Sequence, residues 1–457
     1  MTTPVPNFAE WTALAEELHG GLSLPGTLEY ETRRRVWNGA IDRHPLAIAH
    51  CADAGDVVRA VRFAANHALP MSVRGGGHNV AGSAVRDGAL MLDLGGLNAV
   101  EVSADRSRVS VGGGALWREV DAATQAHACA TTGGMISSTG VGGYTQGGGV
   151  GWLMRRCGLA VDNLIAAEVV LADGGRVRAS AESEPDLFWA LRGGGGGFGV
   201  VTDFEFRLHA LGEVYAGALF HPVDAAPELL RRFRDHVVDA PDELTAMIVF
   251  ASAPPAPFLP ASAHGQRVAV LAWCWSGDPE QGRVRLAALL DPGRTLGQVG
   301  GVMPYAQWQS SLDAHAPAGD HYYWTTAHVD VLDDALIETL VRHGAAPADP
   351  ASELHVHHLG GMLARVPLED SAFVHRNAPF FVNAIGRTPQ AQSFAAVRDW
   401  ARGLRSAVAP WARVGVNANF TSEEGDLRER THDQATLARL AELRRRYDPS
   451  GLFAPLR

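Results

Sequence analysis

Glycine residues gather in four short clusters, and a histidine directly follows the first of them. The chain has 51 glycines among 457 residues, about 11% against a usual 7% or so. The clusters span residues 75–77, 112–114, 147–149 and 193–197. Apolar runs typical of strands or helices bracket each cluster, which argues against a disordered low-complexity segment. Because glycine has no Cβ, successive backbone N–H groups can converge on an anion, so a phosphate-bearing ligand is the natural partner.

Two common phosphate-binding motifs do not fit these clusters. A P-loop requires GxxxxGK[ST], which the sequence lacks. A dinucleotide fingerprint requires a helix after its glycines. Residues 195–199 instead lead into VVTDFEF, whose alternation is typical of a strand. This leaves a cofactor held by several separate loops, with simple tight turns between strands as the alternative.

A second group of chemically capable residues lies at 353–358, Glu-Leu-His-Val-His-His. On a strand, Glu353, His355 and His357 share one face and His358 points the other way. A histidine there can accept a proton from an oxidised O–H or N–H group, and a structurally hydrogen-bonded histidine is the alternative. A metal held by His355 and His357 lacks an obvious third ligand, so we predict no metal site.

The elements that must position these residues mix strands and helices. Strand 70–74 runs into the first glycine cluster, hairpins are predicted at 100–103/108–111 and 164–171/176–179, and a helix is predicted at 116–127. Beyond about residue 210 the glycine runs stop, and helices at 334–343, 390–407 and 434–447 alternate with strands such as 354–358. The aromatic run 321–324 would suit a flat substrate, and a core strand would look the same.

The overall composition limits the binding partners and the cellular compartment that we expect. The net charge is -11 and no basic run stands out, so we expect no nucleic-acid partner. No apolar run approaches the roughly 20 residues that span a bilayer, and residues 1–11 show no secretory leader. Four scattered cysteines without a CxxC pair predict neither a disulfide framework nor structural zinc. We therefore expect a cytoplasmic protein without a membrane partner.

Several stretches together resemble a known family. They are VWNG, SVRGGGHNVAGSAVRDGALMLDL, TGVGGYTQGGGVGWLMRRCGLAVDNL, VVLADG, PDLFWALRGGGGGFGVVT, AFVHRN, VNANF and RRRYDPSGLF, roughly 200 residues in the family's order. The set is similar to the FAD-linked oxidases related to vanillyl-alcohol oxidase and p-cresol methylhydroxylase, in the bacterial branch near berberine bridge enzyme and 6-hydroxy-D-nicotine oxidase. The resemblance implies an α+β, two-domain FAD-binding fold of the p-cresol methylhydroxylase type. Its domains would be an FAD-binding domain at 1–210, a substrate domain with a helix-covered antiparallel sheet at 211–410, and a returning segment at 411–457.

The resemblance also assigns site residues. It implies FAD bonded covalently to His78, for which a surface-loop histidine is the alternative. The implied cofactor contacts are Arg74, Gly75, Gly76, Gly77, His78, Asn79, Gly82, Ser83, Gly133, Thr139, Gly140, Gly142, Gly143, Gly149, Asp162, Val200 and Asn419. Ile136 replaces the cysteine that makes a second flavin bond in many relatives, so a single attachment is expected. Cys157 is interpreted as a buried apolar residue.

The implied reaction is an oxidation. The substrate is expected to be a small aromatic, amine, alcohol or polyketide-like molecule, which gives hydride to flavin N5 while O2 becomes H2O2. The candidate catalytic residues are His355, His357, Tyr144 and Asn417, although Asn417 stands where the family has tyrosine, which weakens a phenol-base mechanism. The alternatives are a flavin oxygenase of secondary metabolism, a non-redox drug-binding protein and a metal hydrolase. The oligomeric state stays open.

Overall fold

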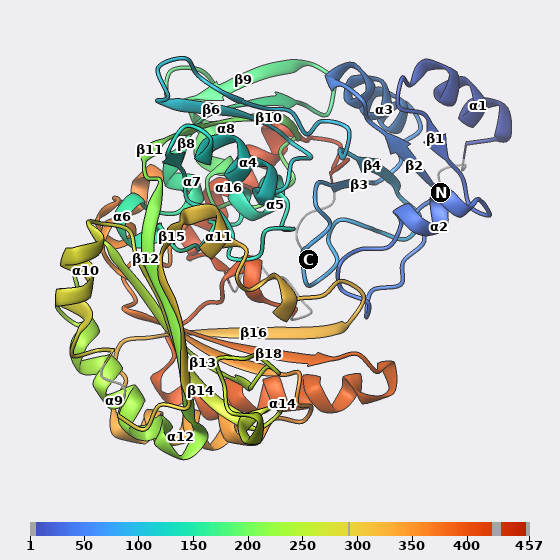
Figure 1. Cartoon of the computed structure of the whole chain (residues 1–457). Coiled ribbons are helices and arrows are strands. Elements are labelled where there is room, and N and C mark those ends of the chain that lie inside the picture. The colour runs from blue at the N-terminus through green and yellow to red at the C-terminus, as the bar shows by residue number, and fades with distance from the viewer. Residues whose placement is uncertain (1–5, 291–292, 423–430, 454–457) are drawn as a thin grey trace.

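The computed structural model describes residues 6–290, 293–422 and 431–453. Residues 1–5, on which the leader expectation partly rests, lie outside this range. Two bodies of secondary structure face each other across a central space (Figure 1). The upper body contains the strands up to Ala210, and the lower body is built around one large sheet. The division at residues 210 and 410 remains our proposal.

The upper body contains three small sheets. The first has the order β1 (Leu22–Ser23), β2 (Ala47–His50), β4 (Leu90–Asp93), β3 (Met71–Arg74), with β2 and β3 both parallel to β4. The second is antiparallel, with the order β5 (Val100–Val102), β6 (Arg108–Gly112), β10 (Val200–Arg207), β8 (Leu164–Val170), β9 (Arg176–Ser180). The third pairs β7 (Cys129–Ala130) with β11 (His209–Ala210). Both predicted hairpins are confirmed.

The lower body is built on a seven-stranded antiparallel sheet. Its order is β15 (Gly297–Pro304), β12 (Glu213–Pro222), β14 (Arg267–Trp275), β13 (Leu244–Ser252), β17 (Glu353–His358), β18 (Phe380–Thr388), β16 (His321–Val329). Alternate side chains of each strand face opposite sides of this sheet. One side packs on helices, and the other side faces the upper body (Figure 1).

The helices cover the outer side of the large sheet and fill the upper body. On the sheet these are α9 (Ala226–Val237), α12 (Asp334–Ala345) and α14 (Phe394–Ala407), which share its main apolar core. The others are α1 (Phe8–Glu17), α2 (Leu28–Arg33), α3 (Ala54–Asn66), α4 (Trp117–Gln125), α5 (Val141–Gln146), α6 (Met154–Cys157), α7 (Ala160–Asn163), α8 (Pro185–Leu191), α10 (Pro279–Leu286), α11 (Tyr305–Gln309), α13 (Met362–Arg365) and α16 (Gln434–Tyr447). No helix among the described residues is both long and apolar enough to cross a membrane.

The chain returns to the upper body at its end. Leu440, Leu443 and Tyr447 of α16 join the core of the second sheet. Phe453 then pairs with Met71 at the start of β3. Beyond β3 the chain enters the first glycine cluster, so the last described residues brace the strand that carries that loop.

Candidate active site

A cavity of about 650 Å³ lies between the two bodies. The loops 75–79, 139–144 and 195–200 form its upper wall, and the inner side of the large sheet forms its lower wall. Three of the four glycine clusters therefore contribute to one wall: 75–77 entirely, 193–197 through Gly195 to Gly197, and 112–114 through Gly113. The sequence predicted such separate loops around one ligand.

The glycines of this wall serve two purposes. Gly76 and Gly140 pack backbone against backbone, and a Cβ on either would overlap the other. A Cβ on Gly143 or Gly196, by contrast, would meet no protein atom within 4 Å, and both residues line the cavity. The missing side chains thus leave backbone open to the cavity, as a wall that lies along a dinucleotide requires.

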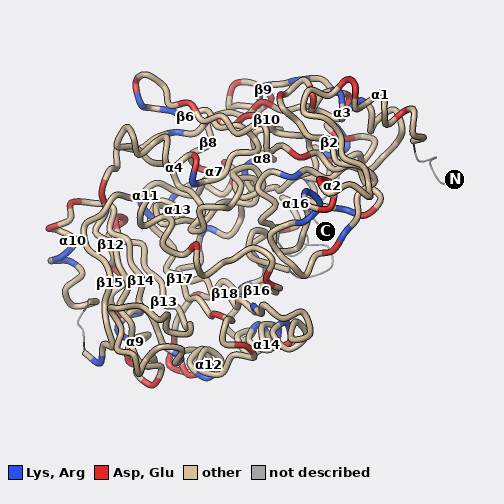
Figure 2. Tube along the Cα trace, turned by 45° about the vertical axis from the view of Figure 1, so that its right-hand side comes forward, with Lys and Arg blue, Asp and Glu red and all other residues tan. Residues whose placement is uncertain are grey.

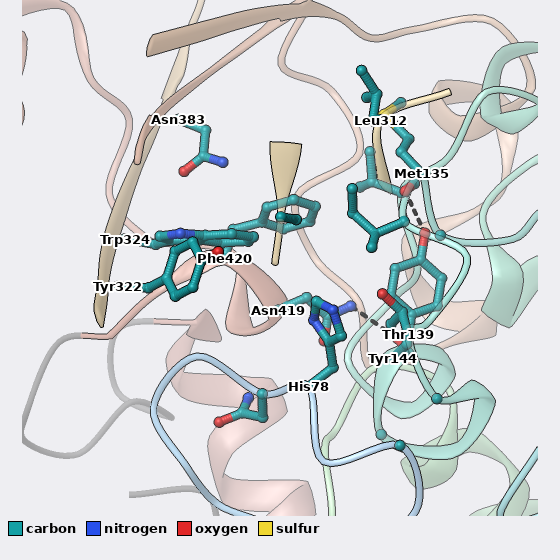
Figure 3. Close-up of a pocket in the computed structure, with 18 of the residues that line it drawn as sticks. His78, Met135, Thr139, Tyr144, Leu312, Tyr322, Trp324, Asn383, Asn419 and Phe420 are labelled. Atoms are coloured by element: carbon teal, nitrogen blue, oxygen red, sulfur yellow. Dashed lines mark hydrogen bonds between the residues drawn. The ribbon is translucent and has the colours of Figure 1, made fainter. Parts of the chain in front are cut away.

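His78 stands at the end of the first glycine loop. Its ring stacks on Trp37 with centroids 4.2 Å apart and an interplanar angle of 18°. Burial lowers its pKa to about 4, so the ring is neutral at pH 7. Its Nε2 is buried and has no hydrogen-bond partner among the described residues. His78 is thus a neutral, fixed imidazole in the cavity wall rather than the surface-loop alternative (Figure 3).

Asn419 links the C-terminal region to the same wall. Its side-chain Nδ2 donates to the backbone carbonyl of Tyr144 at 2.8 Å (Figure 3). The hydroxyl of Tyr144 donates to the carbonyl of Val150, and burial raises the pKa of this phenol well above its usual value. Tyr144 faces the cavity as predicted, but its hydroxyl proton is engaged, which disfavours Tyr144 as a base.

Opposite the glycine loops, one carboxylate joins two histidines. Glu353 accepts from His355 Nε2 at 2.7 Å and from His315 Nδ1 at 3.0 Å. Burial acts to raise the pKa of Glu353, but the two hydrogen bonds outweigh it and lower the pKa below its usual value. The hydrogen bond to Glu353 raises the pKa of His315. The carboxylate therefore stays charged, and His355 keeps its Nδ1 free of that bond.

Two further polar groups share this part of the sheet. His357 follows His355 on the same face of β17, and burial lowers its pKa to about 3. Asn383 of β18 lies beside His355 in the strand register and lines the cavity (Figure 3). His358 points away and its Nε2 lies 3.1 Å from Arg155 Nη1. The predicted alternation of Glu353, His355 and His357 against His358 is confirmed.

Comparison with known proteins addresses the ligand of this cavity. Residues 45–180 match the model of an FAD binding domain. An FAD-linked oxidoreductase of Dictyostelium discoideum is 28% identical over 444 residues, which are 96% of this chain and 94% of that protein. (R)-6-hydroxynicotine oxidase of Paenarthrobacter nicotinovorans is 37% identical over 194 residues, 42% of each chain. The crystal structure of 6-hydroxy-D-nicotine oxidase from Arthrobacter nicotinovorans superposes with a TM-score of 0.85 at 25% identity, covering 99% of this chain and 98% of that one.

The chain contains an FAD-binding domain and is similar to FAD-linked oxidoreductases along nearly its whole length. The matched domain begins before β2 and ends with β9, so it includes the first three glycine clusters and His78. Its fold is the α+β fold of the p-cresol methylhydroxylase type, as the sequence predicted.

Most predicted site residues of the oxidoreductase lie together in the cavity wall. These are Gly75, Gly76, Gly77, His78, Asn79, Ser83, Thr139, Gly140, Gly142, Gly143, Tyr144, Val200, His355, His357 and Asn419. Ile136, in the place of the second flavin-bonding residue, also lines the cavity. Cys157 is buried, as predicted, and burial raises its pKa to about 11.

Six predicted residues are not among those that line the cavity, so their roles stay predictions. They are Arg74, Gly82, Gly133, Gly149, Asp162 and Asn417. Asp162 forms a buried ion pair of 2.7 Å with Arg376, so the charge of Arg376 already balances that of Asp162. Asn417 accepts from the backbone N–H of Asn419 at 3.0 Å and so fixes that neighbour.

The structure adds residues that the sequence did not single out. His315 lies 38 positions before Glu353, and only the fold joins them, so no local signal could have found it. Asn383 is the one polar residue in the run Phe380–Ile385 of β18, and this isolated polar position was a usable signal.

Among the described residues, the one group of three possible metal ligands is His19, Asp53 and Asp56, on α3 and the loops before it rather than in the cavity.

Proposed function

We propose that this oxidoreductase holds FAD in the cavity, bonded to His78 through a single covalent link, and oxidises a small organic substrate with O2. The fit of the site supports the cofactor placement. His78 offers a buried nitrogen without a partner, and Gly143 and Gly196 leave space that a side chain would fill. A neutral imidazole nitrogen is a competent nucleophile toward an electrophilic carbon. The glycine loops, Asn79, Ser83 and Asn419 would hold the rest of FAD.

The observation that carries the proposed reaction is the pair His355–Glu353 in the wall opposite His78. When bound, FAD takes a hydride from the substrate and returns the electrons to O2, so an alcohol and O2 give a carbonyl compound and H2O2. The alcohol must also lose its O–H proton. Glu353 accepts the Nε2 proton of His355, which leaves Nδ1 to take up that proton. The amide of Asn383 can orient the same hydroxyl.

The proposal is tested by peroxide formation in purified holoenzyme supplied with a panel of alcohols and amines. We expect one H2O2 for each product and, for His355→Gln, a kcat lower by about 10²-fold or more. His358→Gln is the matched control, because His358 lies on the same strand but faces away from the cavity. Incorporation of labelled oxygen into the product would favour the oxygenase, and binding of substrate without any turnover would favour the non-redox binding protein.

A further inference from the structure

The cavity-facing side of the large sheet changes its chemistry from strand to strand. One row of paired residues runs straight across it: Phe220, Val270, Val249, His355 and Asn383. All five line the cavity. The row is apolar over β12, β14 and β13 and becomes polar at β17 and β18.

The neighbouring row repeats this change. Ala218, Ala272 and Met247 face the cavity from β12, β14 and β13, and His357 continues the row on β17. We call the part of the cavity over β12, β13 and β14 the apolar half. Figure 3 shows Met135 and Leu312 facing the cavity on the side away from Tyr322 and Trp324. Both are partly buried and pack against the apolar cluster that contains inner-face residues of β12, β13 and β14.

The charges on the cavity wall are few and already paired. Its described lining residues include no lysine, arginine or aspartate, and Glu353 is the one carboxylate among them. Glu353 is held by two histidines. The four strands β12 to β15 carry charge only at Glu213 and Arg267, at strand ends, and are otherwise tan in Figure 2. An ionic group on a ligand would therefore find no partner over these strands.

The polar side chains near the apolar half do not change this picture. Gln307 and Ser311 are exposed, which places them at its outer edge. The hydroxyl of Ser252 donates to the carbonyl of Pro350. A sugar carries a hydroxyl on nearly every carbon, and each one buried without a partner is costly. The apolar half therefore disfavours a carbohydrate.

We propose that the apolar half binds the hydrocarbon body of a neutral substrate whose single oxidisable group reaches His355. This substrate class rests on the proposed function for the identity of the reacting end. Three strand spacings of about 4.8 Å separate β12 from β17, so the body has about 14 Å to occupy. The substrate is then a fused-ring or long-chain alcohol rather than a short or heavily hydroxylated one.

The first test is a substrate series on the wild-type holoenzyme. Primary alcohols from butanol to decanol, 2-naphthalenemethanol, glucose and cellobiose are compared by kcat/KM for peroxide formation. We expect kcat/KM to rise by up to about fourfold for each added CH2 group, and both sugars to be the poorest substrates. A flat chain-length series, or sugars that surpass the long alcohols, would overturn the substrate class while leaving the oxidase intact.

The second test measures binding without turnover. Naphthalene, which has no oxidisable hydroxyl, is titrated into the holoenzyme by calorimetry. The double variant Val249→Thr/Val270→Thr places two hydroxyls in the apolar row with little change of shape, and we expect its Kd to be weaker by about tenfold or more. The exposed Val331→Thr is the control and should bind as the wild type does.

The outcomes separate the two proposals. Naphthalene that fails to bind the wild-type holoenzyme, or that binds the double variant equally well, contradicts the apolar half as a binding site. If naphthalene binds as expected but no alcohol yields peroxide, the oxidase proposal fails and the binding site stands. Should the double variant not fold, as judged by its unfolding midpoint, the wild-type chain-length series decides alone.

Discussion

At the scale of single residues, the site depends on one carboxylate between two imidazoles. Glu353 is buried and accepts from His315 and His355 at once. A carboxylate that accepts from one ring nitrogen fixes the tautomer of that ring and leaves the other nitrogen to take a proton. Glu353 is thus a positioning residue for His355 in the proposed reaction.

Replacement of Glu353 by glutamine tests this role. In Glu353→Gln the amide oxygen can still accept a hydrogen bond from one histidine. The amide NH2 group would face the other histidine, and the negative charge of the carboxylate is lost. We expect kcat to fall by about tenfold to a hundredfold, and KM for a given alcohol to change little, because Glu353 does not hold the substrate body. Steady-state peroxide assays, normalised to bound flavin, measure both constants.

The exposed Glu338→Gln on α12 serves as the control and should keep both constants. If Glu353→Gln retained the wild-type kcat, Glu353 would have no orienting role. If KM rose and kcat did not, Glu353 would contact the substrate instead.

The sequence predicted this residue set only in part. The alternation in 353–358 was enough to place Glu353, His355 and His357 on one face. It could not reveal His315, because η3 (Asp313–His315) is distant in the sequence and only the tertiary fold brings it to the carboxylate. The ion pair of Asp162 could not be predicted for the same reason, because its partner Arg376 is distant in the sequence.

At the scale of elements, the segment 36–39 joins the two bodies. The ring of Trp37 lies between His78 and Tyr322, with centroids 4.2 Å and 3.8 Å away. The amide of Asn38 donates to the carbonyl of Val80 and to that of Tyr322. The loop that carries His78 is thereby fixed to strand β16 of the large sheet. VWNG was recognised only as a matching stretch, and its physical role comes from these contacts.

Trp37→Leu removes the surface on which His78 stacks. An aromatic pair contributes about 0.5–1.5 kcal/mol beyond area burial, so we expect the rate of covalent flavin attachment to fall by about two- to tenfold. Total bound FAD should change much less, because the glycine loops are untouched. The measurement is the flavin retained by acid-precipitated protein as a fraction of all bound flavin, followed over time after FAD is added to apoprotein.

Trp37→Phe keeps an aromatic face and should remain near wild type, and His78→Ala should give a colourless pellet. Full and equally fast attachment in Trp37→Leu contradicts the positioning role of Trp37. A colourless pellet from the wild type would instead contradict the link to His78 itself.

At the scale of the whole molecule, local sequence patterns predicted individual helices and strands better than the way these elements pair and pack together. The helix Gln434–Tyr447 has the predicted bounds, because caps and apolar spacing are local signals. The order β15-β12-β14-β13-β17-β18-β16 could not be read from the sequence. The pairing of distant strands depends on which faces of the strands and helices pack against each other. This packing determines where the cavity and its apolar half lie.

Buried neutral histidines make the stability of the whole molecule sensitive to acid. His328 of β16 stacks on His375 with centroids 4.6 Å apart. Burial, and then the charge of His375, lowers the pKa of His328 well below its usual value. Burial lowers the pKa of His375 to about 4. In the unfolded chain both would titrate near 6.5.

Between about pH 4 and pH 6.5 the unfolded state therefore binds more protons than the folded state, so the free energy of unfolding rises with pH and levels off above about 6.5. A histidine kept neutral contributes about 2 kcal/mol to the difference between pH 7 and pH 5. His328→Phe replaces one such group by an apolar ring beside Phe381, and we expect it to shrink that difference by about this amount. Urea unfolding of both proteins at pH 5 and pH 7 provides the measurement. An unchanged difference in His328→Phe would mean that His328 is already protonated in the folded protein at pH 5, and that the stacked pair carries charge within the core.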